Sequence, residues 1–175
     1  LNDRLCEALL KTAMHFGRIA VEEPQNYVAR ANLMWTSSLA INDLISYGKG
    51  CAWSCHPMEH ELSAYYDITH GAGLAILTPH WMRHVLNTRT VEKFRTYGVN
   101  VWDVPADLPS MEAAELAIKR TADYFKALGL PSRLSEVGID EKYLEIMAEK
   151  SASRMKGTYV ELTKDEILQI FKEAM

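Results

Sequence analysis

The sequence predicts an all-α protein, a helical bundle folded as one domain. Apolar residues recur at spacings of three and four along most of the chain, which is the period of a helix with one buried face. No stretch alternates apolar and polar residues with the period of two that a half-buried strand needs. Glycine, proline and capping residues separate the periodic stretches, and a chain of 175 residues has the ordinary size of a single domain.

The first two predicted helices cover residues 2–22 and about 25–47. The first carries an apolar stripe and is ended by Glu22-Glu23-Pro24. The second is apolar on almost every side, so we expect it to be central to the bundle and to stop at Gly48-Lys49-Gly50. Its polar members are interpreted as capping or helix-to-helix hydrogen-bonding residues: Asn32, Asn42 and Asp43.

A histidine-rich helix follows from His56, and the next helix is predicted over residues 72–87. Pro79 lies in the middle of that segment and is expected to kink it or to restart it near Thr78. A short amphipathic helix is predicted over 89–100, and the loop after it ends at Ser110, which is interpreted as the N-cap of a helix running to Leu128.

Two further helices are predicted near the end of the chain, over about 140–150 and 164–174. Each follows a residue whose side chain can accept a hydrogen bond from the first helical turn, Asp140 or Thr163. The segment Lys156-Gly157-Thr158-Tyr159 is interpreted as a loop between them.

Composition describes a globular protein that does not bind nucleic acid. The chain is 48% hydrophobic and 24% charged, with a formal net charge of −4, which argues against a nucleic-acid surface. No apolar run in the sequence is long enough to span a bilayer, and we expect no signal peptide. Three cysteines, Cys6, Cys51 and Cys55, form no disulfide framework, so we expect a reducing, cytoplasmic location.

Three of the six histidines, His56, His60 and His70, fall within fifteen residues. With Pro57 in the first helical turn, His56 and His60 lie one turn apart on the same face, and His70 follows beside Gly71, where the chain can reverse. Histidines at partly buried sites are often packing residues, but this clustering favours a shared metal ion. The pattern is neither a zincin motif nor a zinc finger, because the second ligands that these motifs need are absent.

The segment from Trp53 to Leu77 resembles the metal-binding signature of the iron-containing alcohol dehydrogenases. The match is to the butanol dehydrogenase branch, H-x3-H-E-L-(S/T)-A-x-Y-x-I-x-H-G, read here from His56 to Gly71. Segments 23–35 and 124–132 also resemble this family, so the resemblance covers nearly the whole chain. It implies the helical C-terminal domain of these enzymes, which is similar to the α domain of dehydroquinate synthase.

The resemblance also implies a metal and a set of site residues. The ion would be ferrous iron, or zinc, held by His56 and His70 together with an Asp-x3-His pair from an earlier helix. His60 matches the histidine between metal and nicotinamide, so it is the candidate for proton relay and for contact with the cofactor. Glu61 is a candidate to support the ligands, and Glu59 is interpreted as a solvated residue.

This sequence departs from the family pattern because it contains no Asp-x3-His. It also has no glycine-rich turn between a strand and a helix that would cradle a dinucleotide. We therefore expect this chain to be a fragment that is inactive alone. In the full protein, an N-terminal domain that binds NADH or NADPH is expected to precede it. Trp35 and Trp53 are interpreted either as walls of a substrate pocket or as core residues. His80 and His84 are interpreted as part of a solvated face beside Arg83.

The function that the resemblance implies is hydride transfer between NAD(P)H and a small aldehyde such as butanal, giving the primary alcohol, in an enzyme expected to be a homo-oligomer. One alternative is a dehydrogenase of glycerol or another polyol. The other is a helical interaction or dimerisation domain without chemistry, which would bind neither metal nor cofactor.

Overall fold

The computed structural model describes residues 1–48 and 53–175. Within these ranges all regular structure is helical, as predicted. The elements follow one another as α1 Asn2–Glu22, α2 Tyr27–Ile41, α3 His56–Tyr66, α4 His70–Val85, α5 Val91–Trp102, α6 Ser110–Ala127, the 3₁₀ turns η1 Leu134–Val137 and η2 Glu141–Tyr143, α7 Leu144–Ala152 and α8 Lys164–Glu173. None of the described helices is both long enough and apolar enough to cross a membrane.

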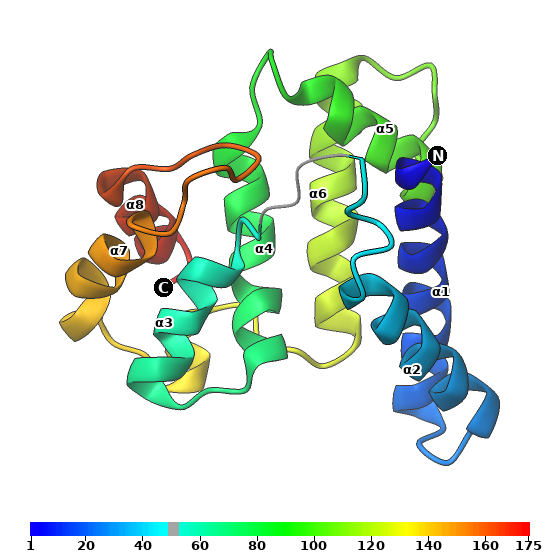
Figure 1. The fold of residues 1–175 in the computed structure, drawn as a ribbon, viewed down its shortest axis with the longest axis horizontal. Coiled ribbons are helices and arrows are strands. Elements are labelled where there is room, and N and C mark those ends of the chain that lie inside the picture. Colours follow the sequence, from blue (N-terminus) through cyan, green and yellow to red (C-terminus); the bar gives the residue numbers. More distant parts are fainter. Residues whose placement is uncertain (49–52) are drawn as a thin grey trace.

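The helices form two packed groups that meet where α4 lies against α6 (Figure 1). One group holds α5 packed on α6, with the α1–α2 hairpin at its outer side. The other holds α3, α4, α7 and α8. The main hydrophobic core lies in this second group and is built from large, fully buried side chains of its four helices: Met58, Leu62, Ile76, Leu77, Leu144, Met147, Ile167, Ile170 and Phe171. Each contributes about 1.5–3 kcal/mol by leaving water, so this core fixes the helix that carries the histidines.

Helix α2 differs from its prediction in both length and position. It ends at Ile41 because the chain turns at Asn42 and Asp43, where Asp43 takes a left-handed φ of 67°. It is not central to the bundle: only Ala29 and Thr36 are buried, and Tyr27, Met34 and Trp35 are 82%, 72% and 67% exposed. The predicted stop at Gly48-Lys49-Gly50 lies partly outside the described residues, and Cys51 lies outside them.

Helix α4 corrects two further predictions. It begins at His70 and not at residue 72, and it continues through Pro79 as one helix, which excludes the restart near Thr78 but not the alternative prediction of a kink. Pro79 is buried, and α4 packs against α3, α6 and α8, so tertiary contacts compensate for the backbone hydrogen bond that proline removes.

Two of the predicted caps occur as expected and one does not. Thr163 and Glu166 form a capping box at the start of α8, and Asp140 accepts a hydrogen bond from the backbone of Lys142 in η2. Ser110 is the first helical residue of α6 rather than its N-cap, because its hydroxyl donates to the carboxylate of Glu92 on α5 at 2.6 Å.

Candidate metal centre

Helix α3 begins at His56 with Pro57 in its first turn, as the sequence predicts. The backbone carbonyl of Cys55 accepts the N–H groups of Met58 and Glu59 at 3.1 and 3.0 Å, which sets the helix start. Burial raises the pKa of the Cys55 thiol to about 12, so it stays protonated at neutral pH. Cys55 is therefore part of the core and not a thiolate ligand.

The turn between α3 and α4 brings His70 back to the histidines of α3. Asp67 ends α3 in the left-handed conformation, with a φ of 52°, so the chain reverses there and not at Gly71. The ring of His70 then lies 5.1 Å from that of His56 and 5.4 Å from that of His60, measured between centroids. The rings of His56 and His60 are 5.8 Å apart. The three histidines that the sequence singled out thus share one space.

Glu59 lies beneath this cluster, so its interpretation as a solvated residue is wrong. Its side chain is 0% exposed, and one carboxylate oxygen contacts Nδ1 of His70. The other oxygen accepts a hydrogen bond from the hydroxyl of Ser63, one helical turn on, at 2.6 Å. The apolar neighbours Met58 and Leu62 in the sequence were the available signal that this part of α3 is buried.

Glu61 is also buried, on another side of α3. Its carboxylate pairs with the guanidinium of Arg154 and lies 4.0 Å from Nζ of Lys150. The carboxylate of Glu61 thus pairs with cationic side chains in and after α7. Within the described residues no hydrogen bond joins Glu61 to the three histidines.

A hollow of about 580 Å³ opens beside the cluster and is lined by His56 and His60. Trp53 forms one wall, with its ring in edge contact with that of His56 at 4.2 Å. The remaining lining residues are Ile41, Pro57, Arg154, Lys156 and Thr158. Trp53 lines this hollow and is not part of the core, so its role as a substrate-pocket wall stays a prediction. Trp35 lies neither in this hollow nor in the core. Sequence reasoning missed Arg154 and Lys156, which are about a hundred residues from the histidines and give no local signal.

The electrostatics of the hollow keep His56 neutral. Burial lowers the pKa of His56, and the positive charges that His70 and His60 can carry lower it further. A neutral imidazole is the form that coordinates a metal ion. At neutral pH the imidazole of His56 is thus in the form that can coordinate a metal ion.

His80 and His84 lie apart from the cluster, but they are not on a solvated face. Burial lowers the pKa of His80, and His84 lies with its Nε2 3.8 Å from the Glu166 carboxylate of α8. Both are half-buried residues at the contact between α4 and α8, because α4 packs on more sides than its sequence indicates.

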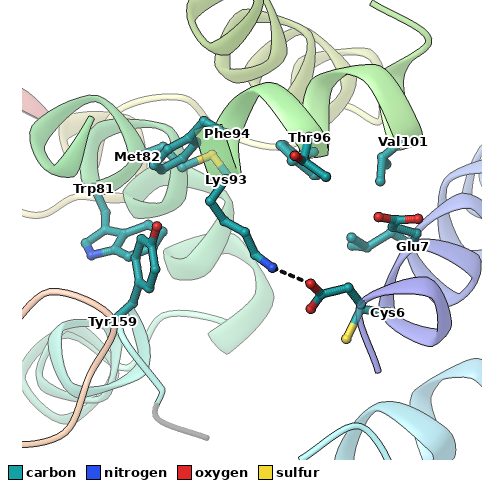
Figure 2. Close-up of a pocket in the computed structure, with 12 residues that line it drawn as sticks. Cys6, Glu7, Trp81, Met82, Lys93, Phe94, Thr96, Val101 and Tyr159 are labelled. Atoms are coloured by element: carbon teal, nitrogen blue, oxygen red, sulfur yellow. Dashed lines mark hydrogen bonds and ion pairs between the residues drawn. The ribbon is translucent and has the colours of Figure 1, made fainter. Parts of the chain in front are cut away.

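A second hollow of about 270 Å³ lies between α1, α4 and α5 (Figure 2). Its walls are mostly apolar, with Trp81, Met82, Phe94 and Tyr159 facing the first turns of α1. Asp3 and Lys93 both line the hollow and form an ion pair of 2.7 Å, drawn as the dashed line from Lys93 in Figure 2. None of the three clustered histidines lines it, so it is separate from the candidate metal centre.

The donor set fits a divalent transition-metal ion. Ligand atoms of Glu59, His60 and His70 lie within 4.8 Å of one another, and the ring of His56 borders the same space. Imidazole and carboxylate donors suit iron, zinc, copper or nickel, so the ligand types do not select one metal. Glu59 contacts Nδ1 of His70, and the assignment of His56 and His70 as metal ligands stays a prediction.

The all-α fold is that of an alcohol dehydrogenase C-terminal domain, and comparison with known proteins gives the family. A model of the "Fe-containing alcohol dehydrogenase family, C-terminal" matches residues 1–175. This chain belongs to the iron-containing alcohol dehydrogenase family. It is similar to the C-terminal domain of the butanol dehydrogenase branch, as its signature indicates.

Two relatives from Clostridium acetobutylicum support the branch. The chain is 56% identical to NADH-dependent butanol dehydrogenase B, over 100% of this chain and 46% of that protein. It is 52% identical to NADH-dependent butanol dehydrogenase A, over 99% of this chain and 46% of that protein. This chain thus spans about half the length of these relatives.

Solved structures agree with this fold. The aldehyde reductase YqhD from E. coli matches with a TM-score of 0.89 and 31% identity, over 99% of this chain and 46% of that one. NADH-dependent butanol dehydrogenase A from Thermotoga maritima matches with a TM-score of 0.89 and 29% identity, again over 99% and 46%. The predicted all-α architecture of this family is therefore confirmed.

Proposed function

We propose that residues 1–175 form the helical metal-binding domain of an NAD(P)H-dependent alcohol dehydrogenase that reduces small aldehydes to primary alcohols. A nucleotide-binding domain would precede it and hold most of NADH or NADPH. The names of the butanol dehydrogenase relatives and the share of their length that this chain spans support the proposal. The cytoplasmic location and the homo-oligomer remain predictions.

The observation that carries the proposal is the convergence of three imidazole rings, two of which, those of His56 and His60, line one hollow. His56 and His70 would hold a divalent cation, iron(II) or zinc, with further ligands from the preceding domain. Two protein ligands alone make a weak site, since metal centres usually have three or four. A bound cation would polarise the aldehyde oxygen as a Lewis acid.

His60 would move the proton that the reaction needs. Its ring is exposed, lies 5.8 Å from that of His56 and lines the hollow where a substrate can enter. An imidazole can carry a proton on a ring nitrogen, so His60 can pass a proton to the developing alkoxide oxygen, directly or through water. Trp53 would exclude water from one side of the aldehyde.

The test uses the complete protein, with any sequence that precedes Leu1, loaded with Fe²⁺ or Zn²⁺. Butanal reduction is measured with NADH and with NADPH, and glycerol and 1,3-propanediol oxidation are measured in parallel to test the polyol alternative. His56→Ala and His70→Ala are expected to lose bound metal and turnover together. His60→Ala is expected to keep the metal and to lose turnover by roughly 10²–10⁴-fold, the usual contribution of general acid catalysis.

His15→Ala is the matched control, because His15 is exposed on α1 and lies outside the cluster. It should keep both metal and activity. If His56→Ala and His70→Ala leave metal content and turnover unchanged, the proposal is wrong. A complete protein that binds neither metal nor cofactor would favour the non-catalytic interaction domain instead.

A further inference from the structure

The geometry around His70 points to a second residue that orients its ring, at a position that the family signature leaves unspecified. We propose that Glu59 is a positioning residue. Its buried carboxylate accepts the Nδ1–H of His70, holds the ring in one tautomer, and leaves Nε2 as the nitrogen that faces the cation. The part of this inference that concerns the cation rests on the function proposed above.

The burial of Glu59 is the first argument. A carboxylate that is 0% exposed loses its hydration, and an uncompensated buried charge is strongly unfavourable. Among the described residues no lysine or arginine pairs with Glu59, and its ionic contact is His70. A positive charge on the far nitrogen of that ring would compensate the carboxylate, as in the carboxylate–histidine–metal arrangements that orient ligands elsewhere.

Ser63 directs the carboxylate toward His70. Its hydroxyl donates to Oε1 of Glu59 at 2.6 Å, which leaves Oε2 for Nδ1 of His70. An ionised carboxylate can only accept hydrogen bonds, so Nδ1 must carry the proton in this contact. The free nitrogen is then Nε2.

Gly73 supplies the space that the arrangement needs. A Cβ atom at Gly73 would lie 2.8 Å from both Cγ and Oε1 of Glu59 and 3.1 Å from Cδ1 of Ile68. Such contacts force the carboxylate to move, so an alanine here would displace Glu59 from His70 without altering either residue. A Cβ at Gly71, two residues earlier on α4, would meet nothing within 4 Å.

The first test reads the tautomer directly. Histidine ¹⁵N–¹H spectra of the complete, metal-free protein should show His70 with its proton on Nδ1. In Glu59→Ala the ring should lose this preference, and in Glu59→Gln, whose amide oxygen can still accept a hydrogen bond from Nδ1–H, it should keep it. If wild-type His70 carries its proton on Nε2, or if Glu59→Ala leaves the tautomer unchanged, the inference is overturned.

The second test measures Zn²⁺ and Co²⁺ affinity by competition with a chelator. Glu59→Ala and Gly73→Ala should each weaken binding by roughly 10–100-fold, the usual effect of removing such a partner. Gly71→Ala is the matched control and should bind like the wild type, and circular dichroism checks that all variants fold. Unchanged affinity in Glu59→Ala would overturn the inference for the cation.

The ligand count separates positioning from direct coordination. X-ray absorption and the visible spectrum of the Co²⁺ protein should show the same ligands in Glu59→Gln as in the wild type. Loss of an oxygen ligand would make Glu59 a ligand and overturn its positioning role. If instead His56→Ala and His70→Ala keep full metal affinity, the proposed function fails, whereas the tautomer measurement still decides the role of Glu59.

Discussion

The buried carboxylate of Glu61 on α3 pairs with the guanidinium of Arg154, which follows α7 in the chain. The two residues are 93 positions apart, so the pair ties the histidine helix to the C-terminal part of the fold. Arg154 also lines the hollow beside His60. One side of the candidate site is therefore held by an ion pair whose acidic partner is shielded from water.

Removing this arginine should destabilise the protein. Arg154→Ala leaves Glu61 buried with only Lys150, 4.0 Å away, so we expect a loss of about 1–3 kcal/mol in the free energy of unfolding, less than for a fully buried pair because Arg154 is partly exposed. Urea unfolding measures this loss. Lys119→Ala, which breaks an exposed pair with Asp123, is the control and should change stability by less than about 0.5 kcal/mol. Equal effects in the two variants would contradict the prediction.

The capping box of α8 should give a pH-dependent contribution. The pKa of Glu166 is lowered, first by the backbone N–H of Thr163 and then by its hydroxyl. A carboxylate with a lowered pKa stabilises the fold at neutral pH, and this contribution is lost as the pH falls through the lowered value. Thr163→Ala should cost about 0.5–2 kcal/mol at pH 7 and less in acid.

Urea unfolding at neutral and acidic pH measures that difference. Thr96→Ala is the control, since Thr96 is exposed inside α5 and, among the residues that the structure describes, its hydroxyl bonds only to the carbonyl of Glu92 on the same helix. Its effect should be small at both values of pH. A cost for Thr163→Ala that does not change with pH would show that Glu166 takes no part in the cap.

The contact between α5 and α6 should not tolerate a side chain at Gly98. A Cβ atom there would lie 3.0 Å from both the backbone oxygen of Ala113 and Cβ of Ala117. Gly98→Ala gains up to about 1 kcal/mol of helix propensity, but overpacking typically costs about 1–3 kcal/mol, so we expect a net loss of thermal stability. Gly71→Ala meets no neighbour and should be neutral or slightly stabilising. A more stable Gly98→Ala variant would contradict this close packing.

The apolar residues of α2 should contribute little to folding. Trp35 and Met34 are mostly exposed, so Trp35→Gln and Met34→Gln should each change the free energy of unfolding by less than about 0.5 kcal/mol. Leu62→Ala in the core should cost about 2–5 kcal/mol. Chemical denaturation compares the three, and a large loss for the α2 variants would place this helix in the folding core after all.

Local signals predicted the helices and the start of the site well. Pro57 and the His56–His60 spacing gave the first turn of α3, and Thr163 gave the start of α8, because caps and helical spacing act within one or two turns. The all-α class followed from the same periodicity, and the resemblance supplied the family, which the comparisons confirm.

The errors concern properties that depend on distant parts of the chain. An apolar helix such as α2 reads as buried, yet sequence pattern alone does not tell which neighbours cover it. Glu59 reads as a surface residue, and its burial arises only when α4 folds back and places Gly73 against it. Arg154 lies 93 residues after Glu61 in the chain, and no sequence motif indicates that it contacts the site.

The buried thiol of Cys55 can be used to measure how often the start of helix α3 opens. It precedes His56 directly, and since its pKa is raised to about 12, a thiol reagent meets neither an accessible sulfur nor a thiolate while α3 is closed. Its alkylation must wait for the start of α3 to open. The slow phase of labelling at Cys55 therefore measures how often the native protein exposes this turn, and metal or cofactor that closes the site should lengthen that phase.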